Sequence, residues 1–401
     1  MDVSLTLLLA LTLVGLAGLV GERIRLERRR KVIPLLIAVT GTRGKSSVTR
    51  MLAAVLRVGG RRVLAKTTGS EATLVLPDGS ERKIRRRGPP SIIEQKRIIK
   101  LAAQLGVDAA VIEVMSIHPE NHVVESRRLL KPDLVLVTNF RVDHTAALGA
   151  TREAVASVLA LDVPPGARVL VSRSECLPTF RTSVEDEGGE LIEVPAGKSS
   201  TLRGGDPTAA TYRFGENLDL VWAAAQALGI DDRSIHAGID RSRGDIGSLR
   251  VWRHQQDGLQ PCFLVNAFAV NDPESTALVF DRVTGALKRE ADLCVGLLSL
   301  RPDRGDRTLQ WLTALREGFL ERFERLYVMG LHARAFERRL KRASRRTSVE
   351  VLEVKGPEET TRMVMSSIRQ ARGLVFGFGN MAGPGEALIA HWNAIGEPFE
   401  V

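Results

Sequence analysis

The sequence contains little cysteine and few aromatic residues. Its 401 residues include three cysteines, and Phe, Trp and Tyr together make up 4%. Cys176, Cys262 and Cys294 stand far apart and form no C-x-x-C unit, which argues against a disulfide framework and a structural zinc site. We expect each to be a small buried side chain. The net charge is +10, but the scarcity of aromatic residues and the lack of a recognised RNA or DNA module argue against a nucleic-acid partner.

Charged residues are missing from residues 4–21, SLTLLLALTLVGLAGLVG. The length of this run is close to the ~20 apolar residues that a membrane-spanning helix needs. Asp2 precedes the run and the basic segment RIRLERRRK follows it, which reverses the order found in a cleaved signal peptide. The positive-inside rule predicts a single-pass anchor in the cell membrane over residues 1–21, a basic juxtamembrane linker over residues 22–33, and a cytoplasmic location for the rest. A buried core helix is the alternative.

One glycine of the general phosphate-binding loop, G-x-x-x-x-G-K-[ST], is also missing. The stretch VTGTRGKSS, residues 39–47, ends like such a loop, but Val39 stands at the position of the first glycine. The apolar run VIPLLIAVT leads into the loop, and residues 45–56 place apolar side chains on one helical face. The order of strand, glycine loop and helix is the context that a phosphate site requires.

The loop therefore predicts a nucleotide site. Backbone N–H groups and the helix N-terminus would hold phosphates, Lys45 would contact the terminal phosphate, and Ser46 would bind Mg²⁺. The residues expected to bind the nucleotide here are Thr40, Gly41, Thr42, Arg43, Gly44, Lys45, Ser46 and Ser47.

Strands alternate with helices along the rest of the chain. VDAAVIEV and PDLVLVTN are predicted core strands, and a helix is expected over residues 91–105, with Ser91 and Glu94 as a capping box. The alternation predicts an α/β fold with a largely parallel sheet. A Gly- and Ser-rich stretch at residues 241–249 precedes a second alternation, so we expect one α/β domain over residues 34–245 and a smaller one over residues 246–401.

Polar residues stand at the ends of the predicted core strands. Glu113 ends one strand, and Asn139, Asp143 and His144 follow another. Ligands of open α/β sheets collect at the carboxyl ends of the strands. A carboxylate in a buried strand is costly unless it is paired or binds a cation, so Glu113 is expected to bind Mg²⁺ together with Ser46. Each residue alone would also suit a structural role, but their combination predicts a site.

These motifs together resemble the Mur ligase superfamily. Its members carry a loop like VTGTRGKSS without the outer glycine, a Glu on the next core strand, a segment like TNFRVDH and a helix like ENLDLVWAAAQALGI. VLAKTTG, RRGPPSIIEQ, NAFAVNDPEST, LRPDRGDR and GFGNMAGPGE further resemble the ligase subunit family of poly-γ-glutamate synthase, the capsule type. The peptidoglycan-building members have an extra domain before the loop, for which we expect no room here.

The resemblance implies a fold and an activity. The fold is a transmembrane helix, a Mur-ligase-like ATP-binding domain with a parallel sheet, and a smaller Rossmann-like α/β domain. The activity is an ATP- and Mg²⁺-dependent carboxylate–amine ligase that activates a glutamate γ-carboxylate as an acyl phosphate and extends poly-γ-glutamate. The implied partners are glutamate and the growing polymer, the membrane, membrane proteins of a synthase and export complex, and further copies of the chain.

The resemblance also assigns roles to residues of this sequence. The catalytic residues would be Lys45, Glu113, Asn139 and His144, and the metal ligands Ser46, Glu113 and His144. Asn217, Arg243, Asn266 and Asn271 would bind the nucleotide, and Arg85, Arg86, Arg301 and Arg304 the anionic substrate. Lys198 is a weaker candidate for a carbamylated lysine, and solvated ion pairs are an alternative role for the arginines.

Two other functions stay open at this point. One is another amino-acid ligase of the same superfamily, such as the folylpolyglutamate type. The other is a membrane-anchored P-loop NTPase with a regulatory role, which would need an Asp after a strand as its second metal ligand and would hydrolyse nucleotide without glutamate.

Overall fold

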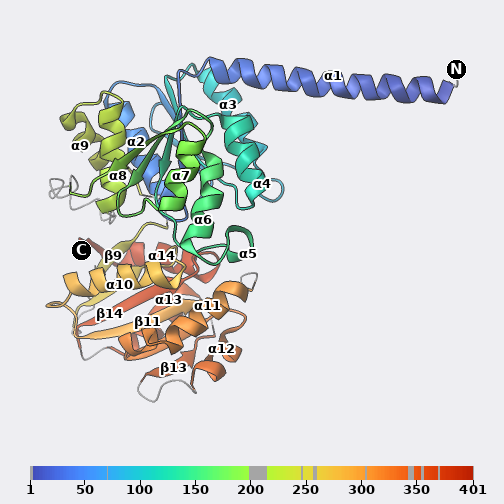
Figure 1. The fold of residues 1–401 in the computed structure, drawn as a ribbon. Coiled ribbons are helices and arrows are strands. Elements are labelled where there is room, and N and C mark those ends of the chain that lie inside the picture. The colour runs from blue at the N-terminus through green and yellow to red at the C-terminus, as the bar shows by residue number, and fades with distance from the viewer. Residues whose placement is uncertain are drawn as a thin grey trace. The chain divides into compact units, whose positions relative to one another are not determined.

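The computed structural model describes residues 3–69, 71–197, 215–244, 247–255, 260–302, 305–341, 347–353, 356–368 and 371–400. The chain divides into two compact units, the first formed by Met1–Arg203 with Phe214–Ser242 and the second by Gly204–Arg213 with Arg243–Val401. Each unit contains one sheet flanked by helices (Figure 1). The predicted α/β class is confirmed in both.

The first unit is built on an eight-stranded sheet with the order β4-β3-β2-β5-β1-β6-β7-β8. Its strands are β1 (Leu35–Thr40), β2 (Val63–Thr67), β3 (Thr73–Val75), β4 (Glu81–Lys83), β5 (Ala109–Glu113), β6 (Leu134–Val137), β7 (Arg168–Ser172) and β8 (Glu190–Val194). The strands from β2 to β8 along this order are parallel, and β3 and β4 form an antiparallel hairpin at one edge. Because β1, β5 and β6 are buried on both faces, their continuous Leu, Ile, Val and Ala runs suit a parallel sheet.

Helices cover both faces of this sheet. They are α2 (Lys45–Val58), α3 (Glu94–Leu105), α4 (Pro119–His122), the π-helix η1 (Val123–Leu130), α5 (Thr145–Leu148), α6 (Arg152–Leu159), the 3-10 helix η2 (Ala160–Asp162), α7 (Pro178–Asp186), α8 (Gly215–Ala227) and α9 (Asp232–Arg241). Ile37 and Val39 of β1 pack under α2, α8 and α9, whereas Leu36 packs with α3 on the opposite face. Helix α9 approaches α2 so closely at Gly238 that a Cβ there would lie 2.4 Å from the Cα of Val55.

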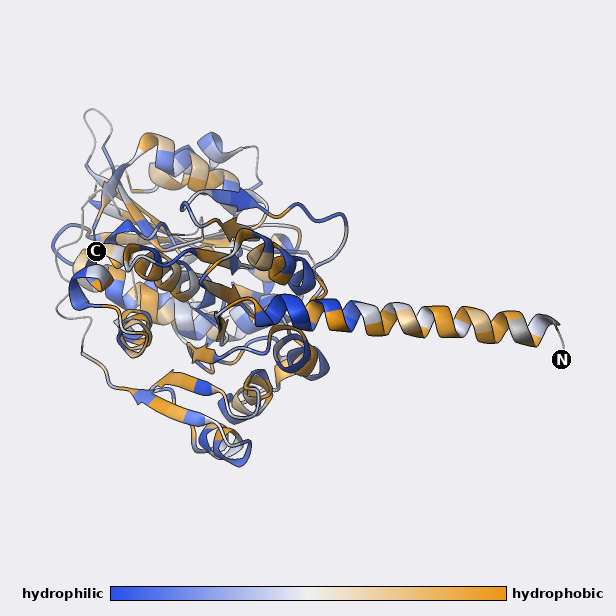
Figure 2. Ribbon diagram, turned by 90° about the horizontal axis from the view of Figure 1, so that it is seen from above, coloured by the Kyte–Doolittle hydropathy of each residue, from blue (hydrophilic) through white to orange (hydrophobic). Residues whose placement is uncertain are grey.

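Helix α1 (Val3–Lys31) joins the apolar N-terminal run to the first unit without a break (Figure 2). The helical segment Leu7–Lys31 is long and apolar enough to cross a membrane. Its most apolar stretch has a mean hydropathy of 1.8, and none of the residues in that stretch is buried. The segment predicted as a juxtamembrane linker is helical as far as Lys31. Leu26 and Ile33 belong to the same hydrophobic cluster as α3, so the end of α1 forms part of the first unit's core.

Ion pairs fasten the end of α1 to the first unit. Glu22 pairs with Lys96 at 2.9 Å, and Glu27 lies 3.5 Å from Lys131. The Arg30 guanidinium pairs with Asp133 at 2.7 Å and donates to the carbonyl oxygens of Leu130, Lys131 and Ile33. The membrane-spanning candidate is thus tied to α3 and to the segments that lead into β1 and β6.

The predicted capping box at the start of α3 is wrong. The helix begins at Glu94, and its N-cap residue, Ile93, makes no side-chain cap. The carboxylate of Glu94 instead binds Lys66, which lies in β2, and Arg86, which lies in the segment after β4. A tertiary ion pair has replaced the local hydrogen bond that the spacing suggested.

The second unit is built on a seven-stranded sheet with the order β13-β12-β11-β14-β10-β9-β15. Its strands are β9 (Arg250–His254), β10 (Cys262–Asn266), β11 (Leu293–Ser299), β12 (Arg325–Met329), β13 (Ser348–Val351), β14 (Gly373–Gly379) and β15 (Glu397–Phe399). The strands from β10 to β13 are parallel, and β9 and β15 are antiparallel to their neighbours. Its helices are α10 (Pro273–Ala286), α11 (Gly305–Arg316), the 3-10 helix η4 (Phe319–Arg322), α12 (Ala333–Leu340), α13 (Pro357–Ser366) and α14 (Pro384–Ile395).

The scarce aromatic residues are concentrated in this second core. Phe280 contacts Phe319, Phe323 and Phe376 edge to face, and Trp311 packs on Phe378 at 4.9 Å between ring centroids. Such pairs add stability beyond the area that they bury.

The three cysteines are free thiols. Cys262 is buried in β10 as predicted, and burial raises the pKa of its thiol to about 12. Cys176 and Cys294 are half-buried, so the prediction of three buried side chains is only partly right.

We predict that Arg30→Ala lowers the free energy of unfolding of the first unit by about 1–3 kcal/mol, because it leaves partly buried carbonyl acceptors without a donor. Denaturant unfolding of the detergent-solubilised full chain would measure this change. Arg23→Ala serves as the control, since the Arg23 side chain is 70% exposed and, among the residues that the structure describes, pairs with Glu27 alone. Equal stabilities of the two variants would contradict the proposed attachment of α1.

Candidate active site

The loop between β1 and α2 has the backbone of an anion site. Gly41 and Gly44 have φ of 122° and 83°, a region that favours glycine. A Cβ on Gly41 would meet the side chain of Thr138, so the loop also passes too close to its neighbour for any larger residue. Helix α2 starts at Lys45 with no side-chain cap, which leaves its first N–H groups available to phosphate oxygens.

The Lys45 side chain folds back across the loop that precedes it. Its Nζ donates to the carbonyl oxygen of Gly41 at 2.7 Å. The ammonium is therefore held over the same loop whose N–H groups would face the phosphates, which is where a lysine can neutralise them.

Glu113 lies beside this loop at the end of β5. Its Cα pairs with that of Val39 in the β1–β5 register, and only 2% of the residue is exposed. The carboxylate oxygen Oε2 accepts hydrogen bonds from Ser46 Oγ at 2.8 Å and from the backbone N–H of Thr68 at 2.7 Å. The predicted pair of Ser46 and Glu113 is thus brought together.

A divalent cation fits the donor set of Ser46 and Glu113. Mg²⁺ prefers oxygen ligands and is commonly held by one or two protein oxygens together with phosphates and waters. A hydroxyl and a carboxylate in contact at the mouth of a phosphate loop meet that requirement. Within the described ranges, no group of three or more His, Cys, Asp or Glu side chains could hold a metal ion alone.

Asn139 holds the loop from the segment that follows the neighbouring strand β6. Its Oδ1 accepts from Thr42 Oγ1 at 2.7 Å and from the N–H of Arg43 at 3.2 Å, while its Nδ2 donates to the Arg43 carbonyl at 3.0 Å. The backbone N–H of Thr42 donates to the Asn139 carbonyl as well. Asn139 therefore holds the shape of the phosphate loop.

Asp143 and His144 follow on the same connection. Asp143 pairs with Arg43 of the loop at 3.1 Å, and His144 Nε2 lies 3.8 Å from the Asp143 carboxylate. His144 has a φ of 47°, a strained backbone for a residue other than glycine. The part of His144 as a metal ligand stays a prediction.

Asn217 of α8 reaches the loop from the other side. It is buried, and a Cβ on Gly44 would lie 2.7 Å from its Nδ2. Thr40 turns inward to Asp162, and Ser47 is half-buried in the first turn of α2.

The predicted substrate arginines are placed differently from one another. Arg86 makes a two-point ion pair with Glu94, at 2.8 and 3.1 Å, so its guanidinium is bound to the first residue of α3. Arg85 is exposed, and Arg301 is half-buried in the second unit. Arg304, together with the candidate Lys198, lies outside the described residues.

Three predicted nucleotide ligands belong to the second unit. Arg243 is exposed at its start. Asn266 is fully buried at the end of β10, where it donates to the Ser248 carbonyl and accepts from the N–H of Phe268. Asn271 Oδ1 is buried and makes no hydrogen bond with the residues that the structure describes. Their part in nucleotide binding stays a prediction.

A buried network below Thr40 was not foreseen. Asp162 accepts from Thr40 Oγ1 at 2.5 Å and from Ser126 Oγ at 2.8 Å, and lies 2.9 Å from His122 Nδ1. Burial lowers the pKa of His122, but the charge of Asp162 and its hydrogen bond outweigh this, so the pKa is raised above 6.5. No sequence pattern marks this network, because its members come from three separate segments: β1, the continuous α4–η1 segment and η2.

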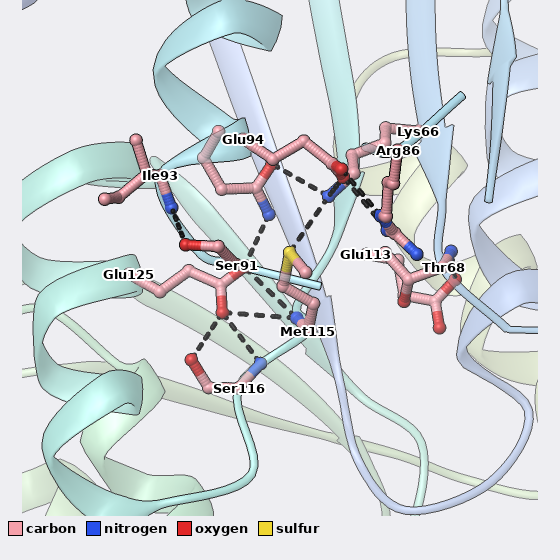
Figure 3. A network of polar contacts seen from close by, with 11 residues as sticks. Lys66, Thr68, Arg86, Ser91, Ile93, Glu94, Glu113, Met115, Ser116 and Glu125 are labelled. Carbon is pink, nitrogen blue, oxygen red and sulfur yellow. Dashed lines mark hydrogen bonds and ion pairs between the residues drawn. The ribbon is translucent and has the colours of Figure 1, made fainter. Parts of the chain in front are cut away.

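A second buried network lies on the other side of Glu113 (Figure 3). Lys66 of β2 is fully buried and pairs with Glu94 at 2.8 Å. Burial lowers the pKa of Lys66, and the charges of Glu94, Glu125 and Glu113 oppose this shift. A lysine inside the predicted strand RRVLAKTT was a signal that sequence reasoning missed, since a buried ammonium needs a partner.

We predict that Asn139→Ala weakens nucleotide binding about tenfold or more, because three side-chain hydrogen bonds that shape the loop are lost. Fluorescent nucleotide binding to the solubilised chain would measure it. Asn121→Ala, on a half-buried helix residue outside the loop, is the control. An unchanged affinity for Asn139→Ala would show that the loop keeps its shape without this clamp.

A second prediction concerns pH. Because folding raises the pKa of His122, its contribution to stability is full below its unfolded pKa of about 6.5 and is lost as pH rises through the higher folded pKa. His122→Gln should therefore reduce stability at pH 6 more than at pH 8.5. Thermal unfolding across this range measures the difference, and parallel curves for the two proteins would contradict it.

Comparisons with known proteins show which families the chain resembles. Residues 39–202 match the family model of the Mur ligase middle domain, and residues 251–395 match that of the poly-gamma-glutamate synthase CapB C-terminal domain. The capsule biosynthesis protein CapB of Bacillus anthracis is 31% identical over 290 residues, which are 71% of this chain and 61% of that protein. The PGA synthase CapB of Bacillus subtilis (strain 168) is 26% identical over 392 residues, 96% of each chain.

Solved structures show the same fold. A bifunctional folylpolyglutamate synthase/dihydrofolate synthase from Yersinia pestis, complexed with AMPPNP and Mn ion, matches with a TM-score of 0.67 at 15% identity, covering 93% of this chain and 92% of that one. MurF from Acinetobacter baumannii matches with a TM-score of 0.61 at 14% identity, covering 93% and 79%. With both halves of the chain matched by family models and one relative aligned along nearly its whole length, the chain belongs to the CapB type of the Mur ligase superfamily.

Proposed function

We propose that this chain is an ATP-dependent ligase that joins glutamate residues through the γ-carboxylate. The observation that carries the proposal is the contact of Ser46 with Glu113 at the mouth of the loop that Lys45 closes. A hydroxyl and a carboxylate that could bind a metal ion beside a phosphate loop suit phosphoryl transfer from a nucleotide. The kinship with proteins named PGA synthase and capsule biosynthesis protein supports glutamate as the substrate.

The reaction has two balanced steps. An oxygen of the glutamate γ-carboxylate attacks the γ-phosphorus of ATP, which forms an acyl phosphate and releases ADP. The amine of a second glutamate then attacks the acyl carbon, the C–O bond breaks, phosphate leaves, and the amine loses a proton. The product is an amide.

The residues of the first unit have distinct parts in this scheme. The N–H groups of the loop and Lys45 bind the phosphates, and Asn139 keeps the loop in shape. Ser46 and Glu113 would hold Mg²⁺, which supplies charge that offsets the negative charge of the transferring phosphoryl group. We place Asn217 against the loop as a further nucleotide contact, and His144 as a contact to the metal-bound phosphate.

The location and partners extend the proposal. Helix α1 would anchor the chain in the membrane with its basic end, residues 23–31, on the cytoplasmic side. The growing polymer is anionic, so arginines of the second unit such as Arg301 are candidates for holding it. Membrane proteins of a synthase complex and further copies of the chain would be its macromolecular partners.

We predict that ADP release by the detergent-solubilised protein depends on glutamate, and that Lys45→Ala abolishes it. Lys96→Ala is the matched control, since it removes the same ammonium from the surface of α3. A coupled assay for ADP, run with and without D- and L-glutamate, measures both effects.

ADP release that neither isomer stimulates would overturn the ligase proposal in favour of a P-loop NTPase. Stimulation by a folate-like acceptor alone would favour the folylpolyglutamate type.

A further inference from the structure

Lys66 is a buried cation that holds three segments of the first unit together. Its side chain is completely shielded from solvent, so it can touch neither substrate nor nucleotide from where it lies. The ammonium pairs with Glu94 Oε1 at 2.8 Å and donates to Gln95 Oε1 at 3.2 Å, both at the start of α3. It also lies 3.3 Å from the sulfur of Met115, in the connection after β5.

The start of α3 is connected through Glu125 to the segment that follows Glu113. Gln95 Nε2 donates to Glu125 at 2.5 Å, and Glu125 is fully buried. Its carboxylate accepts from the N–H groups of Met115 and Ser116 and from Ser116 Oγ. Figure 3 shows the Glu125 carboxylate pointing toward Met115 and Ser116. Met115 and Ser116, the second and third residues after Glu113, are therefore held by Glu125 of η1, which Gln95 of α3 binds in turn.

Lys66 also belongs to the segment that binds Glu113 from the other side. It lies in β2, whose register pairs it with Ile112, the residue before Glu113. Two positions further on, the N–H of Thr68 donates to Glu113 Oε2 at 2.7 Å. Displacement of the β2 segment would move the Thr68 N–H that donates to Glu113. Displacement of the segment after β5 would move the backbone of Glu113 itself.

We propose that Lys66 is a positioning residue for metal binding: its contacts with Glu94, Gln95 and Met115 hold the two segments that orient the Glu113 carboxylate. This proposal rests on the proposed function, since it concerns the metal that Glu113 and Ser46 would hold. Groups that orient a ligand from behind commonly change metal affinity by about 10- to 100-fold when they are lost.

A simple electrostatic role would have the opposite sign. Removal of a positive charge near Glu113 makes the site more negative, which by itself favours a cation. Weaker metal binding in a Lys66 variant would therefore report lost positioning and not lost charge. The double variant Lys66→Met/Glu94→Gln removes one charge of each sign, keeps the net charge of the network and leaves no buried carboxylate without its lysine.

The test is a titration with Mn²⁺ in the presence of ADP, followed by electron paramagnetic resonance of free Mn²⁺, on the full solubilised chain. We expect the Mn²⁺ dissociation constant to rise about tenfold in Lys66→Met and in the double variant. Ser116→Ala, a milder change that removes one tie to Glu125, should raise it less. Lys96→Met, which removes an ammonium from α3, the helix that carries Glu94, should leave the dissociation constant unchanged.

Steady-state kinetics separate positioning from loss of folded protein. We expect the half-saturating Mg²⁺ concentration to rise with little change in that for glutamate, whereas a smaller folded fraction would lower the maximal rate alone. Folded Lys66→Met and double variants with the wild-type Mn²⁺ affinity would overturn the proposal. If Lys66→Met fails to fold, Ser116→Ala decides, and a wild-type affinity there counts against it. Failure of the wild type itself to bind Mn²⁺ with ADP would instead overturn the proposed function.

Discussion

The buried carboxylate of Glu113 is the constraint on which the rest of the site depends. A carboxylate at 2% exposure is costly unless donors or a cation surround it. Its two donors come from different segments, Ser46 on α2 and the N–H of Thr68 beyond β2. In the sheet β5 lies between β2 and β1, and this order brings the donors from both sides to the same oxygen.

The phosphate loop depends on the neighbouring strand in the same way. Its glycines allow the turn, but the turn is held by Asn139 just beyond β6, which makes hydrogen bonds with groups of Thr42 and Arg43. Asp143 adds an ion pair to Arg43 from the same connection. The surroundings of Glu113 are thus built on β5 and β2, and the glycine loop on β1 and β6. Because these strands are parallel and adjacent, their carboxyl ends meet at one edge, where such folds bind ligands.

Helix α3 connects this site to the membrane-spanning candidate. Its first residues, Glu94 and Gln95, contact Lys66, and the next, Lys96, pairs with Glu22 of α1. The end of α1 also shares a hydrophobic cluster with α3. The membrane-spanning candidate is therefore attached to the same element that supports the segments around Glu113, and it runs into this contact as one continuous helix.

Much of this arrangement could be predicted from the sequence because its signals are local or periodic. The loop at residues 39–47 is a continuous motif, and the strand ends marked by Glu113 and Asn139 follow from apolar runs that stop at polar residues. The parts that could not be predicted depend on tertiary contacts. Asp162 and His122 meet only because η2 and the α4–η1 segment pack together beside β1. The spacing of Ser91 and Glu94 suggested a local cap, but a buried lysine from β2 offered Glu94 a stronger partner.

The most direct test of the account follows the oxygen atoms of glutamate. If Lys45, Ser46 and Glu113 serve the transfer of a phosphoryl group to a γ-carboxylate, one oxygen of that carboxylate must leave with the phosphate. Glutamate labelled with ¹⁸O in its γ-carboxylate, incubated with the solubilised chain, ATP and Mg²⁺, should therefore yield phosphate that carries ¹⁸O, as mass spectrometry would detect. Phosphate that is released together with ADP but takes its new oxygen only from water would contradict the central claim.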